Sequence, residues 1–360
     1  MASRDKSTTS LGEKSRVLIV RIGAMGDVIH ALPAAAALRH ARPESTIGWV
    51  IEPRWSPLLR AICRSTAKPV VDQIFLAETR RWKQKPFSVE TLGDITGLRR
   101  RLRENPFDVC VDMQGSIRSA VIGRMAGAGE FCGPAEPREA PAGWLYQRKI
   151  RVHEKHVVEQ GCELLSEGLG LRLPPAEFDL PVDSTAERIC DAALSGFAIS
   201  NDRYALICPT AGWGAKQWPA ERFGAVAREL SRRGIPSVIN AAGPSDHVAE
   251  KVVEFSQGCA TSIAGDIPQL IELTRRSSVV IAGDTGPLHL AAAMRRPVVA
   301  LFGPTDPARN GPYGTAARVL RHGADRRDHR RLAEPEAGLL EITVDEVVRA
   351  AEEILQGTPG

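Results

Sequence analysis

Asp27 is the first residue in the chain whose type and place could do chemistry. It ends a segment in which a short apolar run at 17–20 precedes a turn marked by Gly23 and Gly26. Such a run is typical of a central parallel strand that is covered on both faces. The turn would place Asp27 near a helix N-terminus at the carboxyl end of that strand, where open α/β sheets bind ligands. A carboxylate there could act as a general base. The alternative is a helix cap, because Asp is among the preferred capping residues.

A second strand-end turn, at residues 283–289, favours an anion. It follows the apolar run 279–282, and its two glycines allow a tight turn before the next helix. The free backbone N–H groups at a helix start attract phosphate. Plain capping would also account for Asp284 or Thr285, and His289, one turn into the helix, could be a packed core residue.

Two further turns carry residues that suit a nucleotide. Residues 209–219 combine small residues with Lys216, which can act as a point charge on a phosphate, although a lone loop lysine is usually only solvated. Residues 242–247 supply Asp246, with Glu250 one turn later, and either could accept hydrogen bonds from ribose hydroxyls. The second half of the chain thus holds two turns that are suited to bind phosphate, which predicts a diphosphate-linked nucleotide as the ligand. NAD fits less well, because the N-terminal glycines lack the G-x-G-x-x-G spacing.

Apolar segments alternate with helix-forming segments around these residues, and this order predicts parallel sheets with helices on both faces. In the first half we expect strands at 17–20, 47–51, 70–75 and 107–112, and helices ending near 39, around 58–62, at 89–103 and at 154–169. A basic loop is expected at 80–85 and an irregular loop at 133–151. In the second half we expect strands at 204–208, 237–240, 278–282 and 298–302, and helices at 219–233, 246–256, 267–276, 286–294 and 344–354.

A proline-rich segment at 172–181 separates the two halves. Three prolines within eight residues exclude regular structure there and indicate an extended linker. A cleft between two Rossmann-like domains is a common place for a ligand. We therefore expect a disordered tail at 1–15, an N-terminal Rossmann-like domain at 16–172, a linker at 173–184, a second Rossmann-like domain at 185–342, and a C-terminal helix and tail at 343–360.

Composition excludes several other classes of protein. The 360 residues, 43% of them hydrophobic, leave room for about two globular domains, and the net charge of +4 does not by itself indicate nucleic acid. Seven scattered cysteines without a C-x-x-C pair predict free thiols in a reducing compartment and no structural zinc. Residues 1–15 lack the apolar core of a signal peptide, and no window suits a membrane span. We expect a cytosolic protein that at most lies on a membrane surface. The Arg-rich segment 321–331 is expected to be a solvated loop, with contact to anionic lipid as the alternative.

Three motifs, taken together, resemble a known enzyme family. They are R-V-L-I-V-R-I-G-A-M-G-D-V-I-H at 16–30, K-Q-W-P at 216–219 and G-D-T-G-P-L-H-L at 283–290. The family is the ADP-heptose:lipopolysaccharide heptosyltransferases of glycosyltransferase family 9, and the resemblance extends from residue 16 to about residue 314. It implies an α/β architecture of the GT-B type, with two facing Rossmann-like domains that each hold a parallel sheet.

The resemblance also implies a division of roles. Asp27 would be the general base that deprotonates the acceptor hydroxyl as it attacks the heptose anomeric carbon with inversion. The C-terminal domain would bind ADP-heptose as co-substrate, with no further cofactor. No D-x-D metal motif stands in a suitable place, so a cation and a helix dipole are expected to replace a metal at the diphosphate. The expected donor-binding residues are Met25, Gly26, Thr210, Lys216, Asp246, Glu250, Asp284, Thr285, Gly286 and His289.

Four shorter segments resemble the N-terminal domain of the heptosyltransferase I subgroup, which adds the first heptose to the Kdo sugars of the lipid A core. They are residues 79–83, 112–120, 137–139 and 146–149. Basic side chains there would meet Kdo carboxylates and lipid A phosphates, since Arg suits bidentate recognition of carboxylates. Any single one could instead be a solvated surface charge. The expected acceptor-binding residues are Arg80, Arg81, Lys83, Gln114, Arg118 and Arg138.

This subgroup implies a peripheral location on the cytoplasmic face of the inner membrane, with Kdo-lipid A as the acceptor. Three alternatives remain at this point. One is heptosyltransferase II or another family-9 transferase, whose acceptor differs. Another is a non-catalytic nucleotide-binding protein that kept the cleft. The third is an NAD oxidoreductase.

Overall fold

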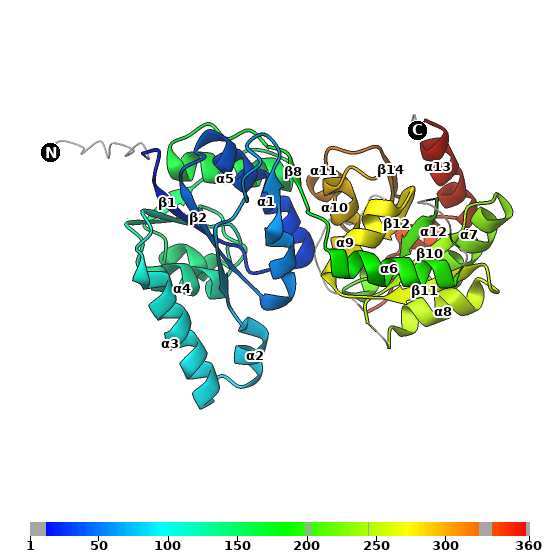
Figure 1. Cartoon of the computed structure of the whole chain (residues 1–360), viewed down its shortest axis with the longest axis horizontal. Coiled ribbons are helices and arrows are strands. Elements are labelled where there is room, and N and C mark those ends of the chain that lie inside the picture. The colour runs from blue at the N-terminus through cyan, green and yellow to red at the C-terminus, as the bar shows by residue number, and fades with distance from the viewer. Residues whose placement is uncertain (1–11, 198, 200–202, 244, 324–332, 358–360) are drawn as a thin grey trace. The chain divides into compact units, whose positions relative to one another are not determined.

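A computed structural model describes residues 12–197, 199, 203–243, 245–323 and 333–357 (Figure 1). The chain forms two compact units, Met1–Pro181 and Val182–Gly360. Residues 1–11 of the tail that was predicted to be disordered lie outside the described residues. Residues 324–332, which include most of the Arg-rich segment 321–331, and the last three residues of the C-terminal tail lie outside them as well.

The first unit is built on a six-stranded parallel sheet with the strand order β4-β2-β1-β5-β6-β7. Its central strand, β1 (Arg16–Val20), pairs with β2 on one side and β5 on the other, so that Val20 lies beside Val50 and Asp112. The strands are mostly buried, as expected for a parallel sheet covered on both faces. The other strands are β2 (Thr46–Ile51), β4 (Gln73–Leu76), β5 (Val109–Asp112), β6 (Glu130–Pro134) and β7 (Arg148–Ile150).

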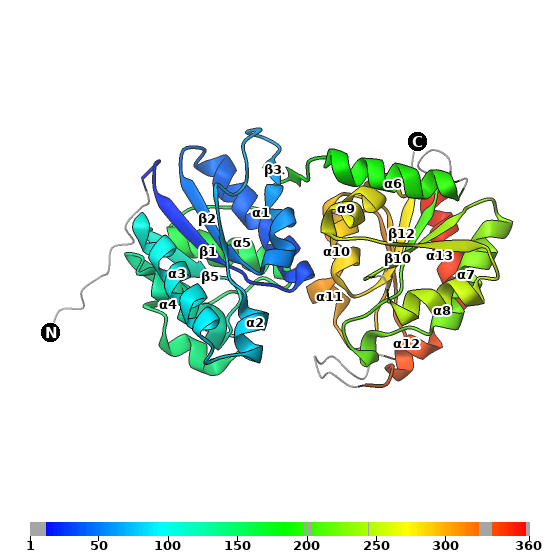
Figure 2. The ribbon, with the colours of Figure 1, turned by 60° about the horizontal axis from the view of Figure 1, so that its bottom comes forward.

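Helices cover both faces of this sheet (Figure 2). On one face α1 (Met25–Ala41) packs against α5 (Val157–Leu169), and on the other α3 (Val89–Glu104) packs against α4 (Ile117–Ala126). A buried cluster that includes Leu18, Leu98, Phe107 and Phe131 fills the space beneath α3 and α4. The remaining helical segments of the unit are the 3-10 helix η1 (Pro53–Arg60), α2 (Thr79–Gln84) and the 3-10 helix η2 (Ala140–Trp144).

The second unit repeats the design. Its parallel sheet has the strand order β11-β10-β9-β12-β13-β14, with β9 pairing with β10 on one side and β12 on the other. The strands are β9 (Ala205–Cys208), β10 (Ser237–Ala241), β11 (Ala260–Ala264), β12 (Val279–Gly283), β13 (Val298–Leu301) and β14 (Ala317–Leu320).

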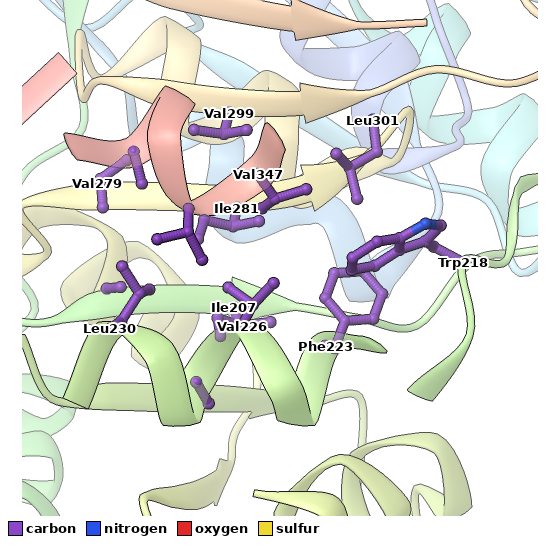
Figure 3. Packing of buried hydrophobic residues seen from close by; sticks show 14 of the residues in the cluster. Ile207, Trp218, Phe223, Val226, Leu230, Val279, Ile281, Val299, Leu301 and Val347 are labelled. Carbon is purple, nitrogen blue, oxygen red and sulfur yellow. The ribbon is translucent and has the colours of Figure 1, made fainter. Parts of the chain in front are cut away.

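The core of the second unit lies between its sheet and two helices, α7 (Ala220–Arg232) and α13 (Val344–Gly357). Figure 3 shows Phe223, Val226 and Leu230 of α7 directed toward Ile207 and Ile281 of the sheet, and all five side chains are buried. α8 (His247–Phe255) packs beside α7, whereas α9 (Ile267–Arg276) and α10 (Gly286–Ala293) cover the other face, with α6 (Ser184–Gly196) against α9 (Figure 2). The short helical segments are η3 (Gly214–Lys216), α11 (Pro307–Asn310) and α12 (Ala337–Glu341).

The predicted α/β class with two parallel sheets is confirmed. So is the prediction of free thiols, because all seven cysteines are unpaired and six of them are buried.

The predicted basic loop at 80–85 is wrong, because residues 79–84 form the helix α2. The cause lies outside the segment. The Glu52 carboxylate accepts a hydrogen bond from the backbone N of Arg80 at 2.9 Å and another from the Thr79 hydroxyl. This carboxylate satisfies the start of a short basic helix, a role that local sequence does not reveal.

Two predictions about the proline-rich regions are also wrong. Residues 58–62 do not form an α-helix, since the 3-10 helix η1 ends at Arg60 and is followed by the strand β3 (Ile62–Cys63). The supposedly irregular segment 172–181 contains β8 (Phe178–Asp179), which pairs antiparallel with β3. The prolines restrict their own positions only, and the residues between Pro175 and Pro181 leave room for the short ladder of β8 with β3.

Most of the remaining corrections concern edge strands and short elements. The segment 133–151 holds the end of β6, η2 and the edge strand β7. The strand predicted at 70–75 is the shorter β4, which begins at Gln73 and ends at Leu76. Three strands, β6, β11 and β14, and the helix α6 were not predicted from the sequence, and β11 and β14 lie at the edges of the second sheet. Edge strands are half exposed, so they lack the continuous apolar run by which the central strands were found.

Candidate functional site

The strand order reverses once in each sheet, and the candidate residues gather at these two places. In the first unit the reversal lies between β1 and β5, and in the second it lies between β9 and β12. At such a point neighbouring loops at the carboxyl ends of the strands diverge, which leaves room for a ligand. Asp27 follows β1, whereas Lys216 follows β9 and Asp284 follows β12.

The Asp27 carboxylate is held from two sides. α1 begins at Met25 with Ala24 as its N-cap residue, so Asp27 is the third residue of the helix. Its Oδ2 accepts a hydrogen bond from the backbone N of Ala24 at 3.1 Å, and its Oδ1 lies 2.9 Å from Nη2 of Arg21. The N-cap interpretation is therefore wrong in position, although the side chain still satisfies a backbone N–H at the helix start. The side chain remains 34% exposed, so it is accessible to a ligand.

Arg21 is the functional candidate that sequence analysis missed. Its side chain is only 12% exposed, and its Nε donates to the backbone O of Asp27 at 3.2 Å. Its Nη1 donates to the backbone O of Met113, at the end of β5. One guanidinium therefore joins the turn after β1 to the turn after β5. A charged residue directly after a buried apolar strand was the available signal.

Gln114 and Asp112 fix the same two turns. Oε1 of Gln114 accepts from the backbone N of Ile22 at 2.7 Å. The buried Asp112 carboxylate accepts from the backbone N of Gln114 at 2.9 Å and from the Tyr146 hydroxyl at 2.8 Å. Burial raises the pKa of Asp112, and these hydrogen bonds counteract part of that effect. Oε1 of Gln114 is thus occupied by a backbone N–H. The predicted role of Gln114 in acceptor binding stays a prediction.

The predicted acceptor-binding cations are distributed over α2 and α4 and the loop after β6. Arg80, Arg81 and Lys83 lie on α2, and Arg81 forms an ion pair with Asp94 of α3. Arg118 of α4 donates to the Thr79 hydroxyl at 2.6 Å, which connects α4 to the start of α2. Arg138 is exposed. The structure thus brings Arg118 close to the start of α2, while their contact with an acceptor stays a prediction.

Asp284 lies at the centre of a buried polar cluster in the second unit. Its side chain is 5% exposed, and its Oδ2 lies 2.5 Å from Nζ of Lys216 and 2.6 Å from the Thr305 hydroxyl. Its Oδ1 lies 3.1 Å from Nε2 of His289. An ionised carboxylate only accepts, so Nε2 must carry the proton. Burial alone would raise the pKa of Asp284, but the hydrogen bond from His289 and the charge of Lys216 outweigh it and hold the pKa well below its usual range.

The start of α10 adjoins this cluster. Thr285 is the N-cap residue and Gly286 the first residue of the helix, and the Thr285 hydroxyl donates to the backbone O of Gly283 at 3.2 Å. No side-chain cap covers this helix start among the described residues. The Lys216 ammonium lies beside it, because Nζ donates to the backbone O of Asp284 at 3.2 Å. The arrangement of a cation and a helix N-terminus is suited to an anion. The sequence allowed His289 to be either a packed core residue or a site residue. Its side chain is buried, and its Nε2 is bound to Asp284.

The remaining donor-side predictions lie after β9 and β10. Asp246 caps α8 by accepting from the backbone N of Val248 at 3.1 Å, and it also accepts from the Thr210 hydroxyl at 2.7 Å. These hydrogen bonds outweigh the effect of burial and lower the pKa of Asp246. Glu250 lies one turn later and pairs with His247. Contact of Thr210, Asp246 and Glu250 with a ribose stays a prediction, as does contact of Met25 and Gly26 with the donor.

Among the described residues there is no group of His, Cys, Asp and Glu side chains that could hold a metal ion. In the same part of the chain, no helix is both long and apolar enough to cross a membrane.

Comparison with known proteins places this geometry in a family. A sequence model of glycosyltransferase family 9 (heptosyltransferase) matches residues 95–337, which is more than half of the chain. The chain belongs to glycosyltransferase family 9. It is therefore a glycosyltransferase, as the motifs predicted.

Individual members of the family extend the likeness to nearly the whole chain. Lipopolysaccharide heptosyltransferase 1 of Salmonella typhimurium is 28% identical over 303 residues, which cover 83% of this chain and 92% of the relative. Among solved structures, the E. coli heptosyltransferase WaaC with ADP is 26% identical, with a TM-score of 0.76 over 94% of this chain and 99% of that chain. A family-9 glycosyltransferase from Veillonella parvula has a TM-score of 0.81 at 20% identity, over 98% of this chain and all of the other. These likenesses confirm the predicted GT-B fold class.

Proposed function

We propose that this family-9 enzyme transfers L-glycero-D-manno-heptose from ADP-heptose to the Kdo residue of Kdo-lipid A, in the synthesis of the lipopolysaccharide inner core. The observation that carries the proposal is the accessible Asp27 carboxylate, held by Arg21 and Ala24 at a strand-order reversal. The likeness to lipopolysaccharide heptosyltransferase 1 and to the E. coli heptosyltransferase WaaC, whose structure contains ADP, supports the choice of substrates.

Asp27 acts as the general base in this proposal. It accepts the proton of the acceptor hydroxyl while the hydroxyl oxygen forms a bond to the anomeric carbon of the heptose. The bond between that carbon and the diphosphate breaks, and its electron pair leaves with ADP. A single displacement of this kind inverts the anomeric centre. Arg21 fixes the direction of the carboxylate, because its guanidinium binds Oδ1 and the backbone O of the same residue.

Lys216 and the start of α10 stabilise the departing diphosphate. Negative charge develops on the leaving oxygen as the bond breaks, and a fixed cation beside free N–H groups lowers the energy of that charge. Asp284 holds the Lys216 ammonium in place through its Oδ2 at 2.5 Å, and His289 and Thr305 hold Asp284. Thr285 and Gly286 form the start of α10. In this proposal, Thr210, Asp246 and Glu250 contact the nucleoside of the donor.

Basic residues of the first unit recognise the acceptor. Arg118 and the three cations of α2 would meet the Kdo carboxylates and the lipid A phosphates, joined by Gln114 and Arg138. Because lipid A is anchored in a bilayer, we infer that the enzyme works at the cytoplasmic face of the inner membrane.

Product analysis tests this proposal. The purified protein is incubated with ADP-heptose and either Kdo-lipid A or the same acceptor that already carries one heptose, and the products are identified by mass. We expect one heptose to be added to Kdo-lipid A only. Transfer to the heptosylated acceptor alone would show the heptosyltransferase II reaction instead. Binding of ADP without turnover of either acceptor would indicate a non-catalytic nucleotide-binding protein.

A further inference from the structure

The connection between α2 and α3 and the first turn of α3 expose large apolar side chains to an unusual degree. Phe87 is 92% exposed, Val89 is 83% exposed and Leu92 is 55% exposed. Single exposed apolar residues are common on protein surfaces, whereas several together indicate an interaction site. Figure 1 shows this connection at the lower end of the first unit, where α2 and α3 meet.

The helical period places two of these residues on the outward side of α3. Thr91, Leu98 and Leu102 are buried and mark the side that faces the protein. Val89 and Leu92, three residues apart, lie on a neighbouring stripe that turns away from the core. Further along the helix the same outward stripe continues with Arg99 and Arg100, which are exposed. The outward side of α3 is thus apolar at its start and basic toward its end.

Positive charge surrounds the apolar residues. Residues 78–104 contain eight Lys and Arg against four Asp and Glu. One of the four acids, Asp94, is paired with Arg81. Lys83 and Lys85 lie four and two residues before Phe87 and are exposed. The combination of exposed apolar side chains with clustered cations is complementary to one kind of surface, a bilayer of anionic lipids.

We propose that this surface, which consists of Lys85, Phe87, Val89, Leu92, Arg99 and Arg100 and is called the α2–α3 surface, docks the protein on anionic membranes. The apolar side chains enter the boundary between headgroups and acyl chains, and the cations bind lipid phosphates. A second copy of the chain is the poorer partner, because a symmetric contact would bring these cations against their own copies. The proposal concerns attachment only, and it holds whichever acceptor the enzyme uses.

Vesicle sedimentation tests the proposal with the full chain. The protein is mixed with vesicles of phosphatidylcholine alone or with added phosphatidylglycerol, at low and at high salt. We expect binding only to the anionic vesicles, weakened by salt because exposed charges are screened. Failure of the wild-type protein to bind them at low salt would overturn the proposal.

Variants locate the contact. Phe87→Ser is expected to weaken vesicle binding about tenfold, because an aromatic ring no longer leaves water. Lys85→Gln is expected to weaken it about fivefold, since one cation near an anionic surface contributes about 1 kcal/mol. The matched controls are Phe197→Ser and Lys251→Gln, at exposed positions of the second unit, which should bind like the wild type.

Two further measurements separate attachment from other effects. Thermal unfolding should be unchanged in Phe87→Ser and Lys85→Gln, because both side chains are exposed. Turnover of an acceptor without acyl chains should also be unchanged, so a failure of the proposed reaction cannot be mistaken for a failure of docking. Equal vesicle binding by the surface variants and the controls would refute the assignment. So would a dimer in sedimentation analysis that dissociates in Phe87→Ser.

Discussion

The two strand-order reversals of this molecule hold the same pair of side-chain types, an aspartate and a cation, in different surroundings. After β1, Asp27 is one third exposed, and only Arg21 and the backbone of Ala24 bind its carboxylate among the described residues. After β12, Asp284 is buried and is bound by Lys216, His289 and Thr305.

This difference separates two kinds of work. A carboxylate that can still be reached by a ligand is suited to accept a proton, whereas one whose oxygens are occupied by three side chains is suited to hold a neighbouring cation still. At equivalent places in similar folds, the degree of burial and the number of partners therefore set the role of an aspartate, more than its residue type does.

The largest effect is expected on stability, from Asp284→Ala. The substitution leaves the Lys216 ammonium without its carboxylate partner in a nearly buried place, and we expect the free energy of unfolding to fall by about 3–5 kcal/mol. Denaturant unfolding measures this change. Asp27→Ala is the matched control and should cost less than about 1 kcal/mol, because its ion pair is partly exposed. Equal losses in the two variants would contradict the contrast.

The pH dependence of the same effect has a defined sign. The pKa of Asp284 is lower in the folded state than its usual value of 3.8, so its ionised form stabilises the fold above that value. This contribution is lost as the pH falls through the folded-state pKa. The difference in melting temperature between the wild type and Asp284→Asn should be constant from about pH 5 to 8 and should shrink below about pH 4. A difference that grows on acidification would show the opposite sign of coupling.

Lys216→Ala should have the next largest effect, on nucleotide affinity. Removal of one charged hydrogen-bond donor from a phosphate site costs about 1.5–3 kcal/mol, which corresponds to roughly a tenfold to hundredfold weaker binding of ADP. Calorimetric titration with ADP checks this. Lys251→Ala, on the exposed side of α8, serves as the control and should bind ADP like the wild type. Unchanged affinity in Lys216→Ala would count against its role at the diphosphate.

A smaller effect is expected from Arg21, which positions the base without touching the reacting atoms. Arg21→Met removes the hydrogen bonds to Asp27 and Met113, and we expect kcat to fall about tenfold while the KM for ADP-heptose changes little. Arg21→Lys keeps the charge but loses the forked pair of donors, so its kcat should lie between that of the wild type and that of Arg21→Met. A merely structural role would lower the melting temperature and leave kcat per folded molecule unchanged.

The central parts of both sheets could be predicted because their signal is local. The runs around Leu18, Ile207 and Ile281 are continuous and apolar, and such runs, alternating with helix-forming segments, specify parallel strands. Elements that depend on distant partners could not be predicted. The helix α2 begins where Glu52 accepts from the backbone of Arg80, and β8 exists because β3 lies beside it.

The same distinction holds for the candidate sites. The placement of Asp27 and Asp284 at strand ends followed from the pattern of apolar runs and glycines. Their contrast in burial did not, because it depends on Thr305 from the turn after β13 and on Arg21 bridging to Met113 after β5. The proposed catalytic role of Asp27 rests on family membership, which the motifs already indicated, and on the exposure of its carboxylate. Only the structure provides that exposure.

The most direct test of this division of labour is a paired measurement on Asp27→Ala. ADP affinity is measured by calorimetry, and turnover of ADP-heptose with a saturating acceptor is measured on the same preparation. We predict an ADP affinity within about twofold of the wild type and a kcat reduced by about 10²–10⁴-fold, the usual contribution of a general base. A variant that keeps most of its kcat, or one that loses its ADP affinity, would contradict the assignment of Asp27 as the base.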